Sequence, residues 1–319
     1  MKKYEQFNEK ELMESAKIEA TYYRALILCE QSNYKDAMQL LREAAAFNHP
    51  MSIYTIGVLY ENGYGVRKNY KLAADYYQQA AKLGAVRAIH NLATFYRKGH
   101  GIKQDLTEAV VLYKKAIALG EIELAPYNLG TMYFKGIGVR ENTEKALELY
   151  KISADTGTAV AKFALGVLYY SNGMLDIGKP LINEAAEIGN QHAILWSAVE
   201  EYFNNGDQSL IEVLKEMINS EEVPTETYVW LGAVYQNGIG VKVDIQKARQ
   251  YYLKAIKLEK LVGSIEDPRA YKMLAKQFSG EKGVFKKNKE REDFYLWLAS
   301  TYEKSRLKKL LEKTIDKYE

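Results

Sequence analysis

The chain has 319 residues, and its 44 lysines and arginines nearly balance its 41 aspartates and glutamates, which leaves a formal net charge of +3. This balance gives no bulk electrostatic reason to expect a nucleic acid or a membrane as partner, and no segment approaches the roughly 20 apolar residues that cross a bilayer. The only cysteine, Cys29, cannot form an intramolecular disulfide, and residues 1–10 lack the apolar run of a secretory signal. Together these features predict a cytoplasmic protein.

The first helix pair is expected within residues 1–49. Small residues 19 positions apart, Ala25 and Ala44, mark the centres of its two helices, with a short turn around Asn33. About fifteen residues are expected before the first helix, which is too few for a helix-turn-helix DNA-binding domain ahead of the repeats. Direct contact with DNA is therefore not expected.

A longer motif, Leu/Ile-Gly-x-x-Tyr-x-x-Gly-x-Gly-Val, begins at residue 56 and returns with variations at residues 92 and 129, so that its copies lie 36 and 37 residues apart. A further clear copy begins at residue 231. A fixed period of this length is typical of a solenoid, in which each repeat is one supersecondary unit. The motif therefore predicts stacked units that share one core.

Each unit contains two segments with helical spacing. In the first unit, Gly57 and Tyr60 belong to the leading segment, and Tyr77 belongs to the second. The glycines at 63 and 65 suit a turn with positive φ between two helices, and Gly84 suits the end of the second helix. Small residues beside large ones predict that the helices interlock.

The sequence thus predicts an all-α fold: one right-handed α-solenoid domain, residues 1–319, made of about eight antiparallel helix pairs. Within it we expect an N-terminal unit at 1–49, three long units at 50–157, two shorter units at 158–222, two long units at 223–300 and a capping helix at 301–319. The last segment carries one apolar stripe beside lysines, as a cap on an open end of a solenoid does.

The pattern resembles the Sel-one-like repeat, a longer-looped relative of the tetratricopeptide repeat. Units at 50–84, 86–120, 123–157 and 225–259 match it well, whereas the units with a 19-residue spacing resemble the shorter tetratricopeptide repeat. The resemblance implies a helical-repeat scaffold that binds protein partners. Because some relatives have been linked to small-molecule binding and hydrolysis, a repeat-fold hydrolase or small-molecule binder stays open as an alternative, and an RNA-binding helical repeat as a weaker one.

The residues themselves give little support to catalysis. The four histidines, at 49, 90, 100 and 192, form no His-x-x-x-His pair, and no Cys-x-x-Cys pair exists. The Gly-x-Gly segments follow predicted helices, whereas a phosphate-binding loop follows a β-strand. We therefore predict a protein that is not an enzyme and that uses neither a cofactor nor a metal.

The expected binding surface is the concave groove lined by the first helix of each pair. In the tetratricopeptide fold an asparagine two residues before the small Gly/Ala often holds a peptide backbone, and Asn91 and Asn128 match that position. The same register gives a cationic middle and an aromatic later half, so we expect a protein or peptide partner with acidic residues or a C-terminal carboxylate and apolar anchors. The candidate groove residues are Tyr54, His90, Asn91, Arg97, Lys98, Tyr127, Asn128, Phe134, Lys135, Trp196, Tyr202 and Trp230.

Overall fold

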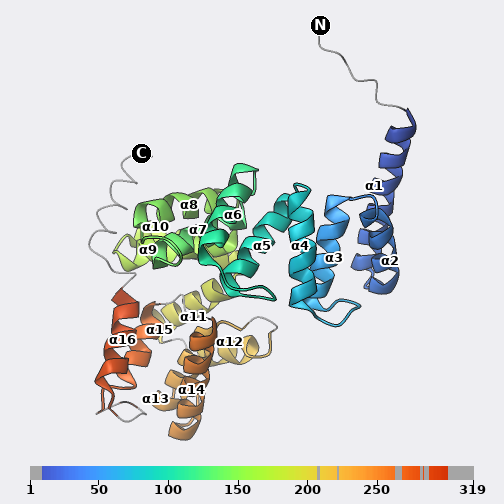
Figure 1. Ribbon diagram of the computed structural model, residues 1–319. Coiled ribbons are helices and arrows are strands. Elements are labelled where there is room, and N and C mark those ends of the chain that lie inside the picture. Colours follow the sequence, from blue (N-terminus) through green and yellow to red (C-terminus); the bar gives the residue numbers. More distant parts are fainter. Residues whose placement is uncertain are drawn as a thin grey trace. The chain divides into compact units, whose positions relative to one another are not determined.

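The computed structural model of the chain describes residues 9–206, 209–220, 223–262, 268–280, 283 and 287–300. These residues form α-helices joined by turns and contain no β-strand (Figure 1), which confirms the all-α prediction. The helices are α1 (Glu9–Glu30), α2 (Tyr34–Ala45), α3 (Pro50–Asn62), α4 (Tyr70–Lys82), α5 (Val86–Lys98), α6 (Leu106–Ala118), α7 (Leu124–Lys135), α8 (Thr143–Asp155), α9 (Ala159–Ser171), α10 (Leu175–Glu187), α11 (Gln191–Asn205), α12 (Leu210–Met217), α13 (Thr225–Asn237), α14 (Ile245–Val262), α15 (Pro268–Lys276) and α16 (Lys289–Ser300).

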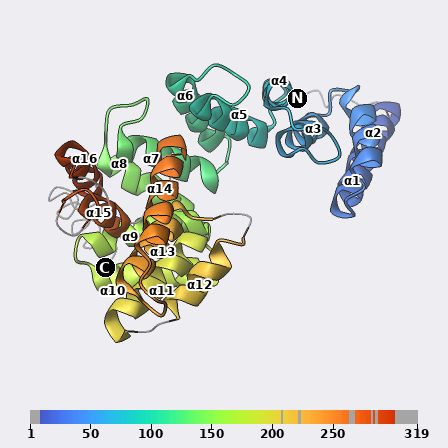
Figure 2. The same ribbon diagram turned by 90° about the horizontal axis from the view of Figure 1, so that it is seen from below.

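The chain divides into two compact units, residues 1–146 and residues 147–319, with the boundary inside α8. In the first unit each helix from α1 to α7 packs against the next one along the sequence (Figures 1 and 2). In the second unit the pairs α9–α10, α13–α14 and α15–α16 pack most extensively, and α13 also contacts α12 and α15. The handedness and the single-domain organisation stay predictions.

The helices follow the predicted pairing. Long units have turns of seven residues, as between α3 and α4, whereas the shorter units have turns of three residues, as between α9 and α10, or four, between α11 and α12. One boundary differs from the prediction: α1 begins at Glu9, and with 22 residues it is ten longer than α2. The predicted cap at 301–319 lies outside the described residues. Among the helices described, none is long and apolar enough to cross a membrane.

In two of the long units, a glycine of the first helix meets a tyrosine ring of the second. A Cβ atom added to Gly57 would lie 2.7 Å from Cε1 of Tyr77, and one added to Gly232 would lie 2.7 Å from Cε1 of Tyr252. Both rings are fully buried. The repeated glycine therefore lets the two helices of a pair approach closely, as the sequence predicted.

The turn between the helices is fixed by a hydrogen bond and a cap. Gly63 ends α3 with φ +78°, a left-handed conformation that glycine adopts at little cost. Six residues later, the amide of Asn69 donates to the carbonyl oxygen of Tyr60 at 2.8 Å, and its side chain accepts from the amide of Leu72 at the start of α4. The same pair of contacts returns with Asp105 after α5, so the motif tyrosine and the cap residue together define the turn.

Candidate functional site

The predicted groove residues divide between the two units. The first unit holds Tyr54, His90, Asn91, Arg97, Lys98, Tyr127, Asn128, Phe134 and Lys135, and the second holds Trp196, Tyr202 and Trp230.

The tryptophans of the second unit lie in its core. Trp196 is 1% exposed and packs edge-on against Tyr170 and Phe163, with ring centroids 5.3 and 6.0 Å away. Trp230 is 2% exposed and lies 5.9 Å from Phe203. The prediction placed both tryptophans on an accessible surface, but the structure gives them a packing role, because both side chains are almost fully buried. Tyr202 is half-buried.

Three candidates on α7 are partly or fully reachable by solvent, and one is not. Tyr127 and Asn128 are half-buried and Lys135 is exposed, whereas Phe134 is buried. The carbonyl oxygen of Tyr127 accepts a hydrogen bond from Thr131 within the helix. The α7 residues therefore offer a mixed polar surface from which Phe134 is withdrawn.

His90 joins α5 to the segment before α7. Its Nδ1 lies 3.4 Å from Oε2 of Glu121, and its ring meets Tyr113 edge-on. The Glu121 carboxylate also accepts from the amides of Leu124 and Ala125, so it caps α7. Burial tends to raise the pKa of the Glu121 carboxyl, but the nearby His90 and the hydrogen bonds from the two amides outweigh it and bring the pKa below its ordinary value.

A second cluster joins α3, α4 and α5. The Tyr77 hydroxyl donates to the Glu61 carboxylate. The Asn91 side chain lies near the hydroxyls of Tyr54 and Tyr77, where it tends to lower the pKa of both. Burial raises the pKa of Tyr54, while the nearby Arg87 guanidinium opposes this shift. Asn91 is thus half-buried beside two tyrosine hydroxyls, and its amide carries both a donor and an acceptor.

Cationic side chains lie at the end of α5. Arg97 and Lys98 occupy its last turn, where the helix dipole favours positive charge, and His100 follows the glycine that ends the helix. Lys98 reaches the surface, yet partial desolvation and the neighbouring Arg97 lower the pKa of its ammonium, and Glu61 only partly offsets them. Burial and Lys98 likewise lower the pKa of His100. Two basic side chains, Arg97 and Lys98, therefore lie near one carboxylate, that of Glu61.

Arg97 has one further property. Its Nε atom is buried, and it donates no hydrogen bond to any described residue. A buried donor without an acceptor costs roughly 1–3 kcal/mol, so an acceptor supplied from outside the chain would be favoured at this position. We call the surface formed by Tyr54, Glu61, Arg87, Asn91, Arg97 and Lys98 the α3–α5 face.

Sequence reasoning found Tyr54, Asn91, Arg97 and Lys98 but missed the two charged residues that complete the α3–α5 face. Glu61 follows the motif tyrosine, and Arg87 precedes His90 by three positions on α5. The only signal for either was its helical position beside a chosen residue. Within the described residues, no group of three or more histidine, cysteine, aspartate or glutamate side chains is placed to hold a metal ion.

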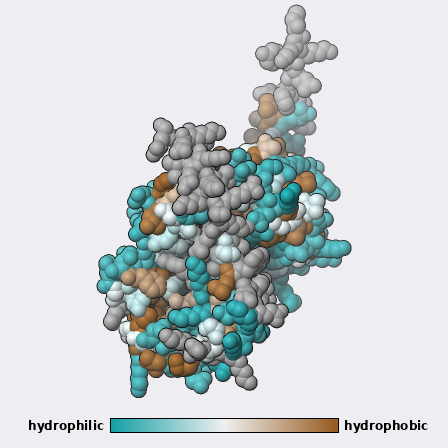
Figure 3. Space-filling view, turned by 90° about the vertical axis from the view of Figure 1, so that its left-hand side faces the viewer, coloured by the Kyte–Doolittle hydropathy of each residue, from teal (hydrophilic) through white to brown (hydrophobic). Residues whose placement is uncertain are grey.

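The surface away from this cluster is mixed. Figure 3 shows one face of the molecule, where hydrophilic residues predominate among the coloured atoms and hydrophobic residues show in separate patches. Exposed large apolar side chains occur on many helices, for example Val111 on α6 and Leu253 on α14. Single exposed apolar residues are ordinary for a protein surface.

Comparison with known proteins agrees with the helical-repeat architecture. The sequence pattern of the Sel1 repeat matches residues 50–84, 86–121, 124–157 and 226–259. These segments coincide with α3–α4, α5–α6, α7–α8 and α13–α14. No curated protein matches the sequence.

The solved structures that are similar to this protein include two repeat proteins. One is a Sel1 repeat protein from Oxalobacter formigenes, which is 24% identical with a TM-score of 0.49, over 88% of this chain and 96% of that chain. The other is c5321, a protective antigen of uropathogenic Escherichia coli that displays an SLR fold, 23% identical with a TM-score of 0.52. The match to c5321 spans 90% of this chain but only 61% of c5321, and it shows a shared fold alone.

The repeated sequence pattern and the helix pairs that it coincides with confirm the resemblance predicted from the sequence: four segments of the chain match the Sel1 repeat, and each of them forms a helix pair.

Proposed function

We propose that this protein is a non-catalytic adaptor for protein–protein interaction, and that its α3–α5 face binds a partner segment bearing a carboxylate. The observation that carries the proposal is the buried Arg97 Nε atom, which lacks an acceptor among the described residues. Sel1 repeats generally serve protein–protein interaction, which supports a partner protein as the source of that acceptor.

The charges of the face favour an anionic ligand. Arg97 and Lys98 are adjacent, and the carboxylate that acts on Lys98 from nearby is Glu61, which already accepts a hydrogen bond from Tyr77. An incoming carboxylate would accept from Arg97 and would relieve the repulsion that lowers the pKa of Lys98. An acidic side chain or the C-terminus of the partner supplies this group.

Asn91 would hold the backbone of the same segment. Its amide lies near the hydroxyls of Tyr54 and Tyr77, and it offers both a donor and an acceptor irrespective of the partner's side chains. Tyr54, which is half-buried, supplies apolar surface beside it. Trp196 and Trp230 are not part of the proposed surface because they are buried. The lone Cys29 fits a reducing compartment, and we retain a cytoplasmic location as part of the proposal.

The test uses a library of short peptides with acidic C-termini, each made with a free carboxylate and with a C-terminal amide. Binding to the full-length protein is measured by fluorescence anisotropy. Arg97→Met keeps the apolar stem but removes the guanidinium, and we expect it to weaken binding by at least about tenfold, the effect of one charge-assisted hydrogen bond. Lys71→Met, at an exposed lysine of α4, is the matched control and should leave binding unchanged.

Three results would contradict the proposal. A library without a binder would show that the protein does not bind acidic peptides of this kind. Binders unaffected by Arg97→Met would show that they bind another surface. Binders weakened equally by Lys71→Met would show that general positive charge is responsible. Loss of affinity on peptide amidation, together with sensitivity to Arg97→Met, would identify a C-terminal carboxylate as the group bound.

A further inference from the structure

The first helix carries an apolar stripe that none of the described residues of its own unit covers. Side chains Met13, Ala16, Ala20, Tyr23 and Ile27 follow one another at intervals of three and four residues, which is the spacing of positions a and d in a coiled coil. All are exposed, and the three large ones are 72%, 59% and 52% exposed at Met13, Tyr23 and Ile27. We call this set the α1 seam.

The seam lies opposite the face that packs in the core. Tyr22 and Ala25 are buried against α2 and α3, and on a helix they stand about half a turn from Tyr23 and Ile27. The core therefore leaves the seam unused. Because α1 is ten residues longer than α2, the half of the seam that contains Met13 also extends past the end of its partner helix (Figure 1).

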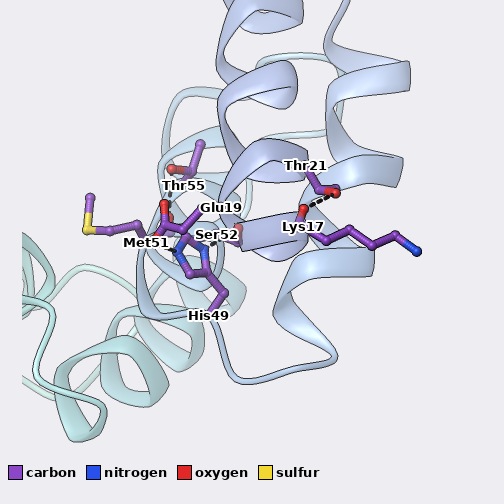
Figure 4. Close-up of polar contacts among 7 residues, drawn as sticks. All are labelled: Lys17, Glu19, Thr21, His49, Met51, Ser52 and Thr55. Atoms are coloured by element: carbon purple, nitrogen blue, oxygen red, sulfur yellow. Dashed lines mark hydrogen bonds and ion pairs between the residues drawn. The ribbon is translucent and has the colours of Figure 1, made fainter. Parts of the chain in front are cut away.

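Charged residues flank the seam with opposite signs on its two sides. Met13, Ala20 and Ile27 take position a of the heptad, and Ala16 and Tyr23 take position d. Lys17 and Arg24 each follow a d residue, and Glu19 precedes the a residue Ala20 on the other side of the seam. Figure 4 shows Lys17 and Glu19 leaving α1 in different directions, with Glu19 toward His49, to which it lies within 3.2 Å. The Glu19 side chain is still half-exposed, so it can meet a further charge.

This arrangement is complementary to itself. When two such helices lie parallel about a two-fold axis, the residue before a on one helix faces the residue after d on the other, five positions later. Glu19 of one copy then meets Arg24 of the second, and the contact occurs twice. In an antiparallel pair Lys17 would approach Arg24, which places like charges together and disfavours that orientation.

We propose that the α1 seam is an interaction surface for a second copy of this chain, which docks by parallel pairing of the two α1 helices. Met13, Ala20 and Ile27 then pack against their own counterparts, and the two alanines of the seam let the helices approach closely. The inference is independent of the proposed partner-binding face on α3 and α5. It leaves that face open in both copies, because the seam belongs to the outer side of α1.

The expected dimer is weak. The seam is about 21 Å long at 1.5 Å per residue, and its area is below the roughly 800 Å² per partner of a standard interface. The half of the seam that contains Tyr23 and Ile27 belongs to the part of α1 that packs against α2, however, so pairing does not bear the cost of ordering this half. A dissociation constant on the order of 10–100 µM is consistent with these terms.

The test is sedimentation velocity of the full-length protein over a range of concentrations that brackets this value. We expect a reversible monomer–dimer equilibrium that Ile27→Lys abolishes, because it places two ammonium groups at one a position. Val111→Lys is the matched control, since Val111 is also 52% exposed but lies on α6, and it should dimerise as the unchanged protein does. A protein that stays monomeric throughout, or a dimer that survives Ile27→Lys, would overturn the proposal.

Orientation is tested by charge and by cross-linking. Arg24→Glu should weaken the dimer roughly tenfold, because two attractive contacts become repulsive, and adding Glu19→Arg should restore it. In a Cys29→Ala background, Met13→Cys should form a disulfide-linked dimer on mild oxidation, because parallel pairing brings position 13 opposite itself. Failure to cross-link in a sample that sediments as a dimer would rule out the parallel arrangement. Circular dichroism of each variant verifies that α1 remains helical.

Discussion

The contact between Gly57 and Tyr77 gives the sharpest stability prediction. Gly57→Ala adds a methyl group whose carbon would lie 2.7 and 2.8 Å from two ring carbons of Tyr77 and 3.3 Å from Cβ of Tyr76. Tyr77 cannot move aside, because it is fully buried, packs edge-on against Phe95 and donates to Glu61. The neighbouring helix must therefore shift.

Two opposing terms set the magnitude. Alanine is favoured over glycine inside a helix by roughly 0.5–1 kcal/mol, whereas overpacking a well-packed core costs about 1–3 kcal/mol. The overlap with Tyr77 is large and the ring is held on several sides, so we expect Gly57→Ala to lower the free energy of unfolding by about 1–2 kcal/mol. The next repeat has Ala93 at the same position, and there the reverse change, Ala93→Gly, should also destabilise, by about 1 kcal/mol.

The distribution of tryptophans lets the assay separate the units. Tryptophans 196, 230 and 297 all belong to the second unit, so their fluorescence follows its unfolding in urea, while circular dichroism follows both units. Gly57→Ala should shift the dichroism transition, and Gly232→Ala, which meets Tyr252 in the same way, should shift the fluorescence transition. A midpoint for Gly57→Ala equal to or above that of the unchanged protein would refute the packing argument.

Three further predictions concern single contacts. Because the pKa of Glu121 is lowered, its carboxylate stabilises the fold above about pH 4.3 and loses this effect as pH falls through the lowered pKa. The difference in the free energy of unfolding between the unchanged protein and Glu121→Gln, measured by urea titration, should therefore shrink toward low pH. A constant difference would contradict the ionic contact with His90. Asn69→Ala removes the cap on the amide of Leu72 and should cost about 0.5–2 kcal/mol in the same titration, so an unchanged midpoint would show that the cap is dispensable. Arg97→Met, which removes a buried donor without an acceptor, should leave the melting temperature unchanged or higher, and a marked drop would show that the guanidinium holds the fold together.

Much of the fold was predictable because several copies of the motif indicate the same helix pair. The interval between copies of the motif fixed the helix pairs, and the glycines marked their turns: Gly63 has the expected positive φ. Segments outside the repeated motif were harder to predict. The length of α1 depends on residues before the first repeat, where no second copy gives a comparison, and its start at Glu9 was missed.

The candidate site was predictable only in part. Helical position identified Asn91, Arg97 and Lys98, since one helix face follows from the sequence alone. Burial does not follow in the same way: Trp196 occupies the position that Asn91 holds in the second long unit, but rings from α9 surround it. Contacts between helices of different pairs decide which side chains reach solvent, and a single sequence does not state them.

The turns of the long repeats also reach back to the previous repeat. The second glycine of the turn leaves no room for a side chain, because it abuts the first residue of the preceding second helix: Gly65 meets Tyr34, Gly101 meets Tyr70 and Gly138 meets Leu106. Since the contact point is the same in each case, excising one whole period would bring Gly138 against Tyr70 in place of Leu106. Gene duplication or loss can therefore lengthen or shorten this array without a new joint having to evolve.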